Sequence, residues 1–279
     1  MIVSCVTYGL KAEESPPFVI GHLMGQLGNQ MFQIATATSL ALDHGAIPLF
    51  PDLHAQRENI PLNYKHVFFR LDATTPSSPI QFAYNESHFD FRPIPYEPNM
   101  SIYGYFQSEK YFKHHKQDIL QLFAPSQEIL DYLNLHYSDI IHHPKTVAIH
   151  IRMYKDTTPF YHPFVGWNYI LKAIKRFDTD SLFVIFSDQI AFCRKKLAKL
   201  LRAHKLVFIE GNHHFQDLYL MSLCKHNVIS NSSFSWWGAY LNNNPDKTVL
   251  APSPTRWFGP GLADKNTKDI LPEDWIILQ

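Results

Sequence analysis

The 279-residue chain carries 25 Lys and Arg residues against 25 Asp and Glu residues, a formal net charge of zero, and 46% of its residues are hydrophobic. This balance is that of a globular protein, excludes extensive disorder, and provides no basic footprint for nucleic acid. A phosphate-bearing ligand would therefore have to be held by local hydrogen-bond donors.

Sequence features also bear on the compartment. The cysteines Cys5, Cys193 and Cys224 are scattered and form no C-x-x-C pair, so we expect buried thiols in a reducing compartment. No apolar run approaches about 18 residues, the length that predicts a transmembrane helix. Residues 1–10 lack the basic start of a signal peptide. We therefore expect a cytoplasmic protein.

In chain order, the first half opens with a strand-like run at 18–23 and a glycine turn at 25–28. Apolar residues from Met31 to Leu42 then follow helical spacing, Gly45 ends that helix, and 47–50 is the next strand. Between 51 and 99, prolines and aromatics break the pattern and predict no defined element. The remaining predictions for this half are a strand at 101–106 and helices at 109–123 and 127–137.

The second half alternates regularly between strands and helices. Short unbroken apolar runs, typical of strands buried on both faces, occupy 146–151, 182–186, 206–209, 227–230 and 248–251. Helical patterns separate them at 167–177, 190–201, 215–224 and 234–241. Repeated βα units predict a parallel, doubly wound sheet. The chain is thus expected to be an α/β protein of two Rossmann-like halves facing across a cleft, 1–143 and 144–279, with His142-His143-Pro144 at the junction.

Polar residues follow the predicted strands of the second half, at the edge where ligands bind in such sheets. His150 and Arg152 end the first strand, Ser187 and Asp188 follow the second, and residues 210–212 follow the third. The fourth leads into the serine-rich segment 230–237. Ordinary polar loops would also give this pattern, so composition alone leaves the interpretation open.

The serine-rich segment is the most specific of these signals. Hydroxyls and unpaired N–H groups at the start of a helix suit a phosphate. A helix N-cap followed by a buried tryptophan pair would give the same residues. Asp217, in the first turn of the preceding helix, is either a dipole-favoured residue or an acceptor for a guanine. The turn at 25–30 is not G-x-G-x-x-G and is a weak signal by itself.

Metal-binding patterns are not convincing. Asp178-Thr179-Asp180 precedes its strand and is better explained as a solvated turn. The histidine pairs at 114–115, 142–143 and 213–214 lack the partners of a metal site, so no metal ligand is predicted. A basic helix face at 194–205 is better explained as a solvated surface than as a contact with an anionic membrane carrying a lipid-linked acceptor.

Five segments in order resemble those of the α-1,2-fucosyltransferase family, glycosyltransferase family 11. They are residues 25–33 (GQLGNQMFQ), 104–112 (GYFQSEKYF), 147–152 (VAIHIR), 186–188 (FSD), and 217–222 with 231–238 (DLYLMS, NSSFSWWG). The resemblance covers most of the chain and is weakest between Pro51 and Asn99.

The resemblance implies a GT-B fold with an acceptor-side first half and a GDP-fucose-binding second half. It implies inverting transfer of L-fucose from GDP-fucose to the 2-hydroxyl of a terminal galactose in a glycan, with no cofactor and no obligatory metal. Arg152 and His150 are then the expected catalytic residues, Arg152 neutralising the leaving diphosphate. The expected donor-binding residues are Gly28, Asn29, Gln30, Ser187, Asp188, Asp217, Ser232, Ser233, Phe234 and Ser235.

The sequence departs from the family immediately after Arg152. Where the family has His-x-Arg-Arg-Gly-Asp, this chain continues with Met153, Tyr154 and Lys155, so the second arginine is missing. The alternatives are therefore a non-catalytic GDP-sugar or glycan-binding protein, or a transferase with another donor or linkage. The general base is not identifiable, and Glu109 and Asp156 are candidates in name only.

Overall fold

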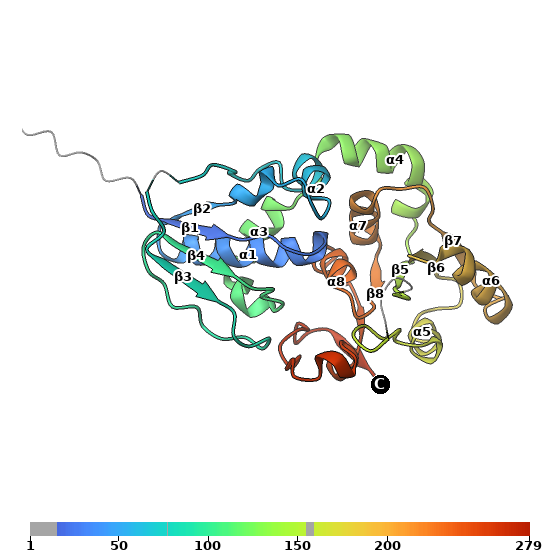
Figure 1. Cartoon of the computed structure of the whole chain (residues 1–279). Helices are drawn as coiled ribbons and strands as arrows, with labels where there is room; N and C mark the ends of the chain where they lie inside the picture. Colours follow the sequence, from blue (N-terminus) through green and yellow to red (C-terminus); the bar gives the residue numbers. More distant parts are fainter. Residues whose placement is uncertain (1–15, 77, 155–158) are drawn as a thin grey trace, which may run out of the picture.

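The computed structural model describes residues 16–76, 78–154 and 159–279, which form two β-sheets covered by helices (Figure 1). One sheet has four strands in the order β2-β1-β4-β3, and the other has six in the order β10-β9-β8-β5-β6-β7. Every strand pairing in the described parts of the chain is parallel. The predicted α/β class is confirmed.

The four-stranded sheet uses only residues from the first half of the sequence. Its strands are β1 (Phe18–Gly21), β2 (Ile47–Leu49), β3 (Phe82–Asn85) and β4 (Met100–Tyr103). The helices of this half are α1 (Leu27–Asp43), α2 (Ile60–His66), α3 (Lys116–Leu122) and α4 (Gln127–Ile141), with 3₁₀ turns η1 (Pro51–His54), η2 (Glu109–Tyr111) and η3 (Lys113–His115). Helix α1 is buried along most of its length, so it forms the centre of this half.

The six-stranded sheet is formed by the second half. Its strands are β5 (Thr146–Ile151), β6 (Leu182–Ser187), β7 (Lys205–Phe208), β8 (His226–Val228), β9 (Val249–Pro252) and β10 (Ile276–Leu278). Its helices are α5 (Trp167–Ile174), α6 (Ile190–Leu200), α7 (His214–Leu223) and α8 (Ser233–Tyr240), with 3₁₀ turns η4 (Pro254–Arg256) and η5 (Pro260–Leu262). Alternate residues of β5 point into different cores, because strand side chains alternate between the two faces.

The two halves share one core, in which α1 packs against α8. The Phe32 ring lies 4.5 Å from that of Trp236 and 5.1 Å from that of Trp237, and Phe112 stacks on Trp237 at 5.5 Å. Aromatic pairs of this kind contribute about 0.5–1.5 kcal/mol each beyond area burial. The tryptophan pair therefore fixes the start of α8 against the start of α1.

The end of the chain returns to the first half, as the red segment of Figure 1 shows. Asp269 accepts hydrogen bonds from the Phe91 N–H at 3.1 Å and from Lys110 Nζ at 2.6 Å. The Trp236 indole N–H donates to the carbonyl of Ile270 at 2.8 Å. The end of the chain is therefore bonded both to the first half and to α8.

Several elements differ from the sequence-based expectation. The single helix predicted over 109–123 is wrong: η2, η3 and α3 replace it, because Phe112 leaves helical geometry (φ −142°, ψ 3°) to bury its ring beside Trp237. Elements η1, α2 and β3 occupy the stretch with no prediction, and β10, an edge strand with two of its three residues exposed, was not predicted.

Two expectations about the compartment can be compared with the structure. Cys193 and Cys224 are buried and free, whereas Cys5 lies outside the described residues. In the described ranges, no helix combines the length and the apolar character needed to cross a membrane.

Candidate active site

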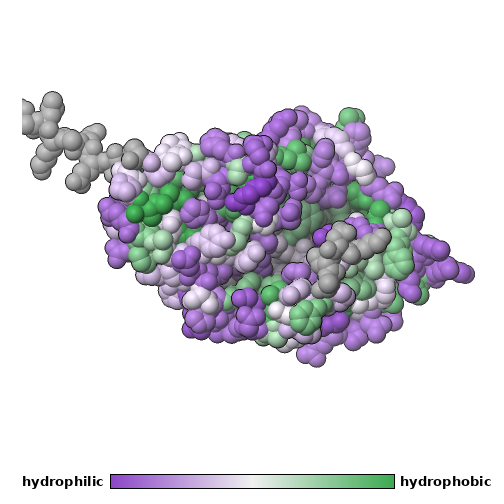
Figure 2. All heavy atoms as spheres, viewed as in Figure 1, coloured by the Kyte–Doolittle hydropathy of each residue, from purple (hydrophilic) through white to green (hydrophobic). Residues whose placement is uncertain are grey.

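The carboxyl ends of β5, β6 and β8 lie at one edge of the six-stranded sheet because its strands are parallel. Figure 2 shows the surface hollowed between the two halves, beside the grey atoms.

Arg152 follows β5 directly and is held by two neighbours. Its Nη1 lies 3.2 Å from Oδ2 of Asp188, and its guanidinium lies 5.1 Å from the centre of the Tyr154 ring. Asp188 also accepts the N–H groups of Met153 at 2.9 Å and Tyr154 at 3.1 Å. The Arg152 side chain remains 35% exposed. It is thus oriented while keeping donors open toward a ligand.

His150 is an uncharged residue of the sheet interior. It is 6% exposed, and its Nδ1 lies 3.0 Å from the Ser230 hydroxyl. Burial first, and the charge of Arg152 second, lower its pKa to about 3. The imidazole is therefore neutral at physiological pH, so it cannot donate a proton as an imidazolium. Its contact with Ser230 instead joins β5 to the serine-rich turn.

The serine-rich turn presents backbone donors. Ser232 is the N-cap of α8, and among the described residues no acceptor lies within hydrogen-bond reach of the N–H groups of Ser233, Phe234 and Ser235. The Ser235 hydroxyl is buried and shapes the turn by accepting the Ser230 N–H at 3.3 Å. Open N–H groups at a helix start are the arrangement that binds phosphate.

The N-terminus of α1 lies against the N-terminus of α8. A Cβ placed on Gly28 of α1 would lie 2.5 Å from the carbonyl carbon of Ser233 and 2.6 Å from the nitrogen of Phe234, so only glycine permits the approach. Oδ1 of Asn29 accepts the Ser233 hydroxyl at 2.8 Å and Gln107 Nε2 at 2.9 Å. Two positive helix ends repel each other and favour an anion beside them.

Two predicted donor-binding residues have their polar groups engaged by partners within the protein. Gln30 is fully buried, and its amide group binds the carbonyls of Gly25 at 2.7 Å and Glu58 at 3.0 Å and accepts from Asn63 at 2.7 Å. Its side chain therefore holds the glycine turn. The Ser187 hydroxyl donates to the Ile151 carbonyl at 2.6 Å and accepts the Gln189 N–H at 3.0 Å, so it ties β5 to β6.

Asp217 lies in the first turn of α7, one helix away from the serine-rich turn. Its Oδ1 accepts from the Asn212 amide at 3.0 Å, and Asn212 Oδ1 accepts the hydroxyls of Tyr132 and Tyr137, both at 2.9 Å. Burial raises the pKa of Asp217 to about 6. Asp217 is thus linked to α4 through Asn212, and its carboxylate offers acceptors to a planar base.

A pocket of about 440 Å³ lies at the carboxyl ends of β3 and β4. Glu86 forms part of its wall and accepts the N–H groups of Tyr105 at 2.7 Å and Phe106 at 3.0 Å. Burial raises the Glu86 pKa to about 7. The other lining residues are polar or aromatic in large part: Met24, Asn85, Ser87, His88, Phe89, Tyr103, Gly104, Tyr105 and Lys265. Sequence gave no sign of Glu86, which lies in the segment that predicted no element.

Four other carboxylates were considered from the sequence. Asp178 and Asp180 are exposed and pair with Lys145 at 2.8 and 3.0 Å, as a solvated turn does. Glu109 lies on η2, outside the pocket wall, and burial raises its pKa. Asp156 lies outside the described residues, as does Lys155.

Comparison with known proteins identifies the family. The profile of glycosyl transferase family 11 matches residues 18–278. The chain belongs to glycosyl transferase family 11. An alpha-1,2-colitosyltransferase from Escherichia coli is 31% identical over 94% of this chain and 99% of its own length. A galactoside 2-alpha-L-fucosyltransferase from Bos taurus is 30% identical over 78% of this chain, and the match spans 62% of that relative.

The fold has solved counterparts. The fucosyltransferase NodZ from Bradyrhizobium superposes with a TM-score of 0.56 at 13% identity, over 81% of this chain and 92% of that one. This similarity confirms the predicted GT-B-like fold. Family 11 membership makes the chain a glycosyltransferase.

The family pattern clarifies the departure after Arg152. Tyr154 stands where the family 11 pattern has glycine, and its φ is +51°, a conformation that glycine adopts without strain. The Tyr154 hydroxyl donates to the carbonyl of Asn231, and its ring stacks on His162 at 5.1 Å. The backbone thus has a positive φ at this position, while the tyrosine joins Arg152 to the serine-rich turn.

Proposed function

We propose that this chain transfers L-fucose from GDP-fucose to the 2-hydroxyl of a terminal galactose in a glycan, with inversion at the anomeric carbon. The observation that carries the proposal is the meeting of the α1 and α8 N-termini, at Gly28 and Ser233, with Arg152 tied to the same turn through Tyr154. This arrangement suits a diphosphate leaving group. The relatives that transfer fucose or colitose support it.

On the donor side, negative charge grows on the diphosphate as its bond to the sugar breaks. The Arg152 guanidinium and the N–H groups of Ser233 and Phe234 are fixed before the reaction, and one such donor is typically worth about 10²–10³-fold in rate. We therefore expect transfer to need no metal ion and no cofactor. Asp217 is assigned to the guanine, because a carboxylate accepts from its N1–H and amino group.

The acceptor is assigned to the pocket at β3 and β4. Tyr103 and Tyr105 are 50% and 41% exposed on its wall, and such rings offer flat apolar surface to a sugar. Glu86 and Lys265 add acceptor and donor groups for hydroxyls. The Asn29 side chain connects this pocket with the serine-rich turn, because it accepts hydrogen bonds from both Gln107 and Ser233. Gln107 directly follows the Tyr105–Phe106 loop.

A second candidate is transfer of colitose to the same acceptor position. It is favoured by the Escherichia coli colitosyltransferase, which matches nearly the whole chain. Colitose is L-fucose without its 3-hydroxyl, so both donors present the same diphosphate to Arg152. The two differ only in contacts to the sugar ring.

The deciding experiment measures GDP release and product mass with GDP-fucose, GDP-colitose and GDP-mannose, each against a panel of β-galactosides. We expect turnover with GDP-fucose and an α-1,2 linkage in the product by NMR. Turnover only with GDP-colitose would select the second candidate. Calorimetric binding of GDP-fucose without turnover in any combination would overturn catalysis and favour a non-catalytic GDP-sugar-binding protein.

For location, we place the protein in the cytoplasm, at the inner face of the membrane when its acceptor is lipid-linked. A lipid-linked acceptor would bring the basic stretch 194–205, on α6 and β7 at one edge of the six-stranded sheet, against the anionic surface, whereas without such an acceptor this stretch is a solvated surface. Arg194 already pairs with Glu210 at 2.8 Å, which leaves mainly the lysines for a surface contact. Sedimentation with anionic but not with neutral vesicles is expected, and equal sedimentation with both would contradict it.

A further inference from the structure

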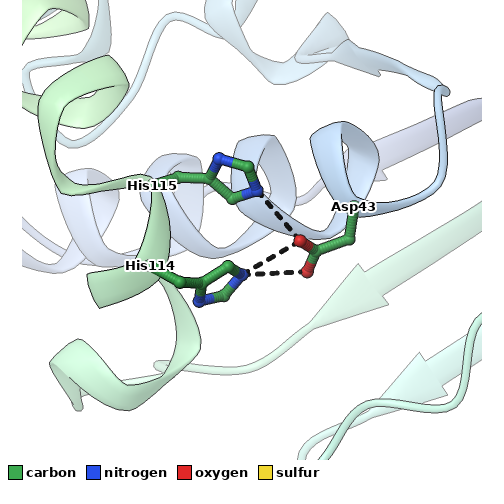
Figure 3. A group of neighbouring side chains, drawn as sticks. All are labelled: Asp43, His114 and His115. Atoms are coloured by element: carbon green, nitrogen blue, oxygen red, sulfur yellow. Dashed lines mark hydrogen bonds and ion pairs between the residues drawn. The ribbon is translucent and has the colours of Figure 1, made fainter.

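Three metal-ligating side chains meet at the end of α1 that is remote from the cleft (Figure 3). Nε2 of His114 lies 3.0 Å from both carboxylate oxygens of Asp43, and Nε2 of His115 lies 2.9 Å from Oδ1. Asp43 is the last residue of α1, and the two histidines belong to η3. The sequence showed no i, i+4 partner for this histidine pair, and the fold places the Asp43 carboxylate beside it. The partner is 71 positions away in sequence.

The spacing of these atoms is close to that of a first-row metal centre. Zinc binds imidazole nitrogen and carboxylate oxygen at about 2.0–2.2 Å, which places two ligands of a tetrahedron about 3.3 Å apart. The three ligand atoms lie within 4.8 Å of one another, so small rotations of exposed side chains suffice to enclose an ion. Two nitrogens and one carboxylate oxygen favour zinc over magnesium or calcium, which prefer oxygen ligands.

The second ring nitrogen of His115 provides an independent observation. Nδ1 lies 3.3 Å from Oδ2 of Asp118, while Nε2 faces Asp43. With a metal on Nε2, the neutral ring donates its Nδ1–H to Asp118. A carboxylate behind a ligating histidine is the usual outer partner of such sites, because it fixes the tautomer.

We propose that Asp43, His114 and His115 bind one zinc-class divalent ion, with water completing its coordination. The ion would link the end of α1 to η3, which directly precedes α3. Because it joins two elements of the first half, the ion has a structural role. The 17-residue helix α1 separates this place from Gly28 by about 22 Å, at 1.5 Å per residue. The proposal does not depend on the donor or acceptor of the transferase.

Metal binding to the full chain tests the proposal. Chain dialysed against a chelator and then against buffer is titrated with Zn²⁺ by calorimetry and with Co²⁺ by visible absorption. We expect one site, and an intense absorption typical of tetrahedral Co²⁺. Saturating Zn²⁺ should raise Tm by about 2 °C or more. The variants Asp43→Asn and His115→Gln should each weaken Zn²⁺ binding at least about tenfold.

The matched control is the double variant His142→Gln/His143→Gln, a histidine pair in which His142 is exposed and His143 is half-buried. It should bind Zn²⁺ like the parent chain. If Asp43→Asn binds Zn²⁺ with unchanged affinity, or if the control loses the site, the proposal is overturned. Because Asp43 also accepts hydrogen bonds, His114→Gln serves as a further variant, and circular dichroism verifies that each variant is folded. An equal Tm rise with Mg²⁺ would likewise overturn a nitrogen-ligated site.

Discussion

The carboxyl edges of the two sheets differ in the charge and shape that they present. At the six-stranded sheet, Arg152 and the open N–H groups of α8 make an edge of donors. At the four-stranded sheet, Glu86 and two half-exposed tyrosines make a pocket of acceptors and flat rings. The first suits a diphosphate and the second a neutral sugar. The difference teaches that two parallel sheets of one protein can present different charge and shape at their carboxyl edges.

Both edges rely on a buried carboxylate that binds backbone. Asp188 accepts the N–H groups of Met153 and Tyr154, and Glu86 accepts those of Tyr105 and Phe106. Asp188 pairs with Arg152 at 3.2 Å, whereas Glu86 shares its pocket with Lys265. Changes at each edge should therefore affect different kinetic constants.

The largest expected effect comes from Arg152. Arg152→Ala should lower kcat with GDP-fucose by about 10³-fold, because the leaving diphosphate loses its charge-assisted donor. The matched control is Arg194→Ala, since Arg194 also pairs with a carboxylate, Glu210, at the surface. Steady-state kinetics should show the control within about twofold of the parent, because surface ion pairs contribute little. Retention of full activity by Arg152→Ala would remove Arg152 from its role.

The next effect concerns the junction of the two edges. Gly28→Ala should lower transfer by about 10²-fold, because its Cβ would collide with the backbone of Ser233 and displace α8 by a fraction of an ångström or more. Gly45→Ala is the control: it has open space around it but a φ of +61°. It should lower Tm without changing kcat/KM. Equal losses of activity in both variants would mean that the effect is one of stability.

Sequence predicted the carboxyl edge of the six-stranded sheet far better than that of the four-stranded sheet, for a physical reason. Strands β5 and β6 are buried on both faces, so their apolar runs mark them and also mark the polar residues that follow, such as Arg152 and Asp188. Strand β3 has every second residue exposed and follows a segment shaped by tertiary contacts. The Glu86 bonds to the Tyr105–Phe106 loop have no local signature.

Sequence was weaker at the level of single side chains. Gln30 and Ser187 have the chemistry of donor-binding residues, yet both are engaged by backbone. Residue type gives the capacity to form hydrogen bonds, whereas the partner is set by packing. The same limit hid Asp43 beside His114 and His115, because no spacing links positions so far apart.

A third effect is a pH dependence of GDP binding. Burial raises the pKa of Asp217 to about 6, and only its ionised form accepts both guanine hydrogens. GDP affinity should therefore fall about tenfold between pH 7.5 and pH 5, and Asp217→Asn should bind more weakly but lose most of this dependence. Calorimetry at several pH values measures it. An identical pH profile in the variant would contradict the assignment of Asp217 to the base.

The smallest effect should appear only at the carboxyl edge of the four-stranded sheet. Glu86→Gln replaces one of two backbone acceptors by an amide N–H, so one of the N–H groups of Tyr105 and Phe106 loses its partner. A hydrogen bond of about 1 kcal/mol corresponds to about a fivefold rise in KM for the galactoside. KM for GDP-fucose should not change, and an equal rise in both KM values would contradict separate edges.

The stability of the Glu86→Gln variant provides a second measurement. Burial raises the folded-state pKa of Glu86 to about 7 from an ordinary 4.5, so the folded chain binds this proton more tightly than the unfolded chain does. The free energy of unfolding should therefore decrease as pH rises from about 4.5 to 7, and Glu86→Gln should flatten this decrease.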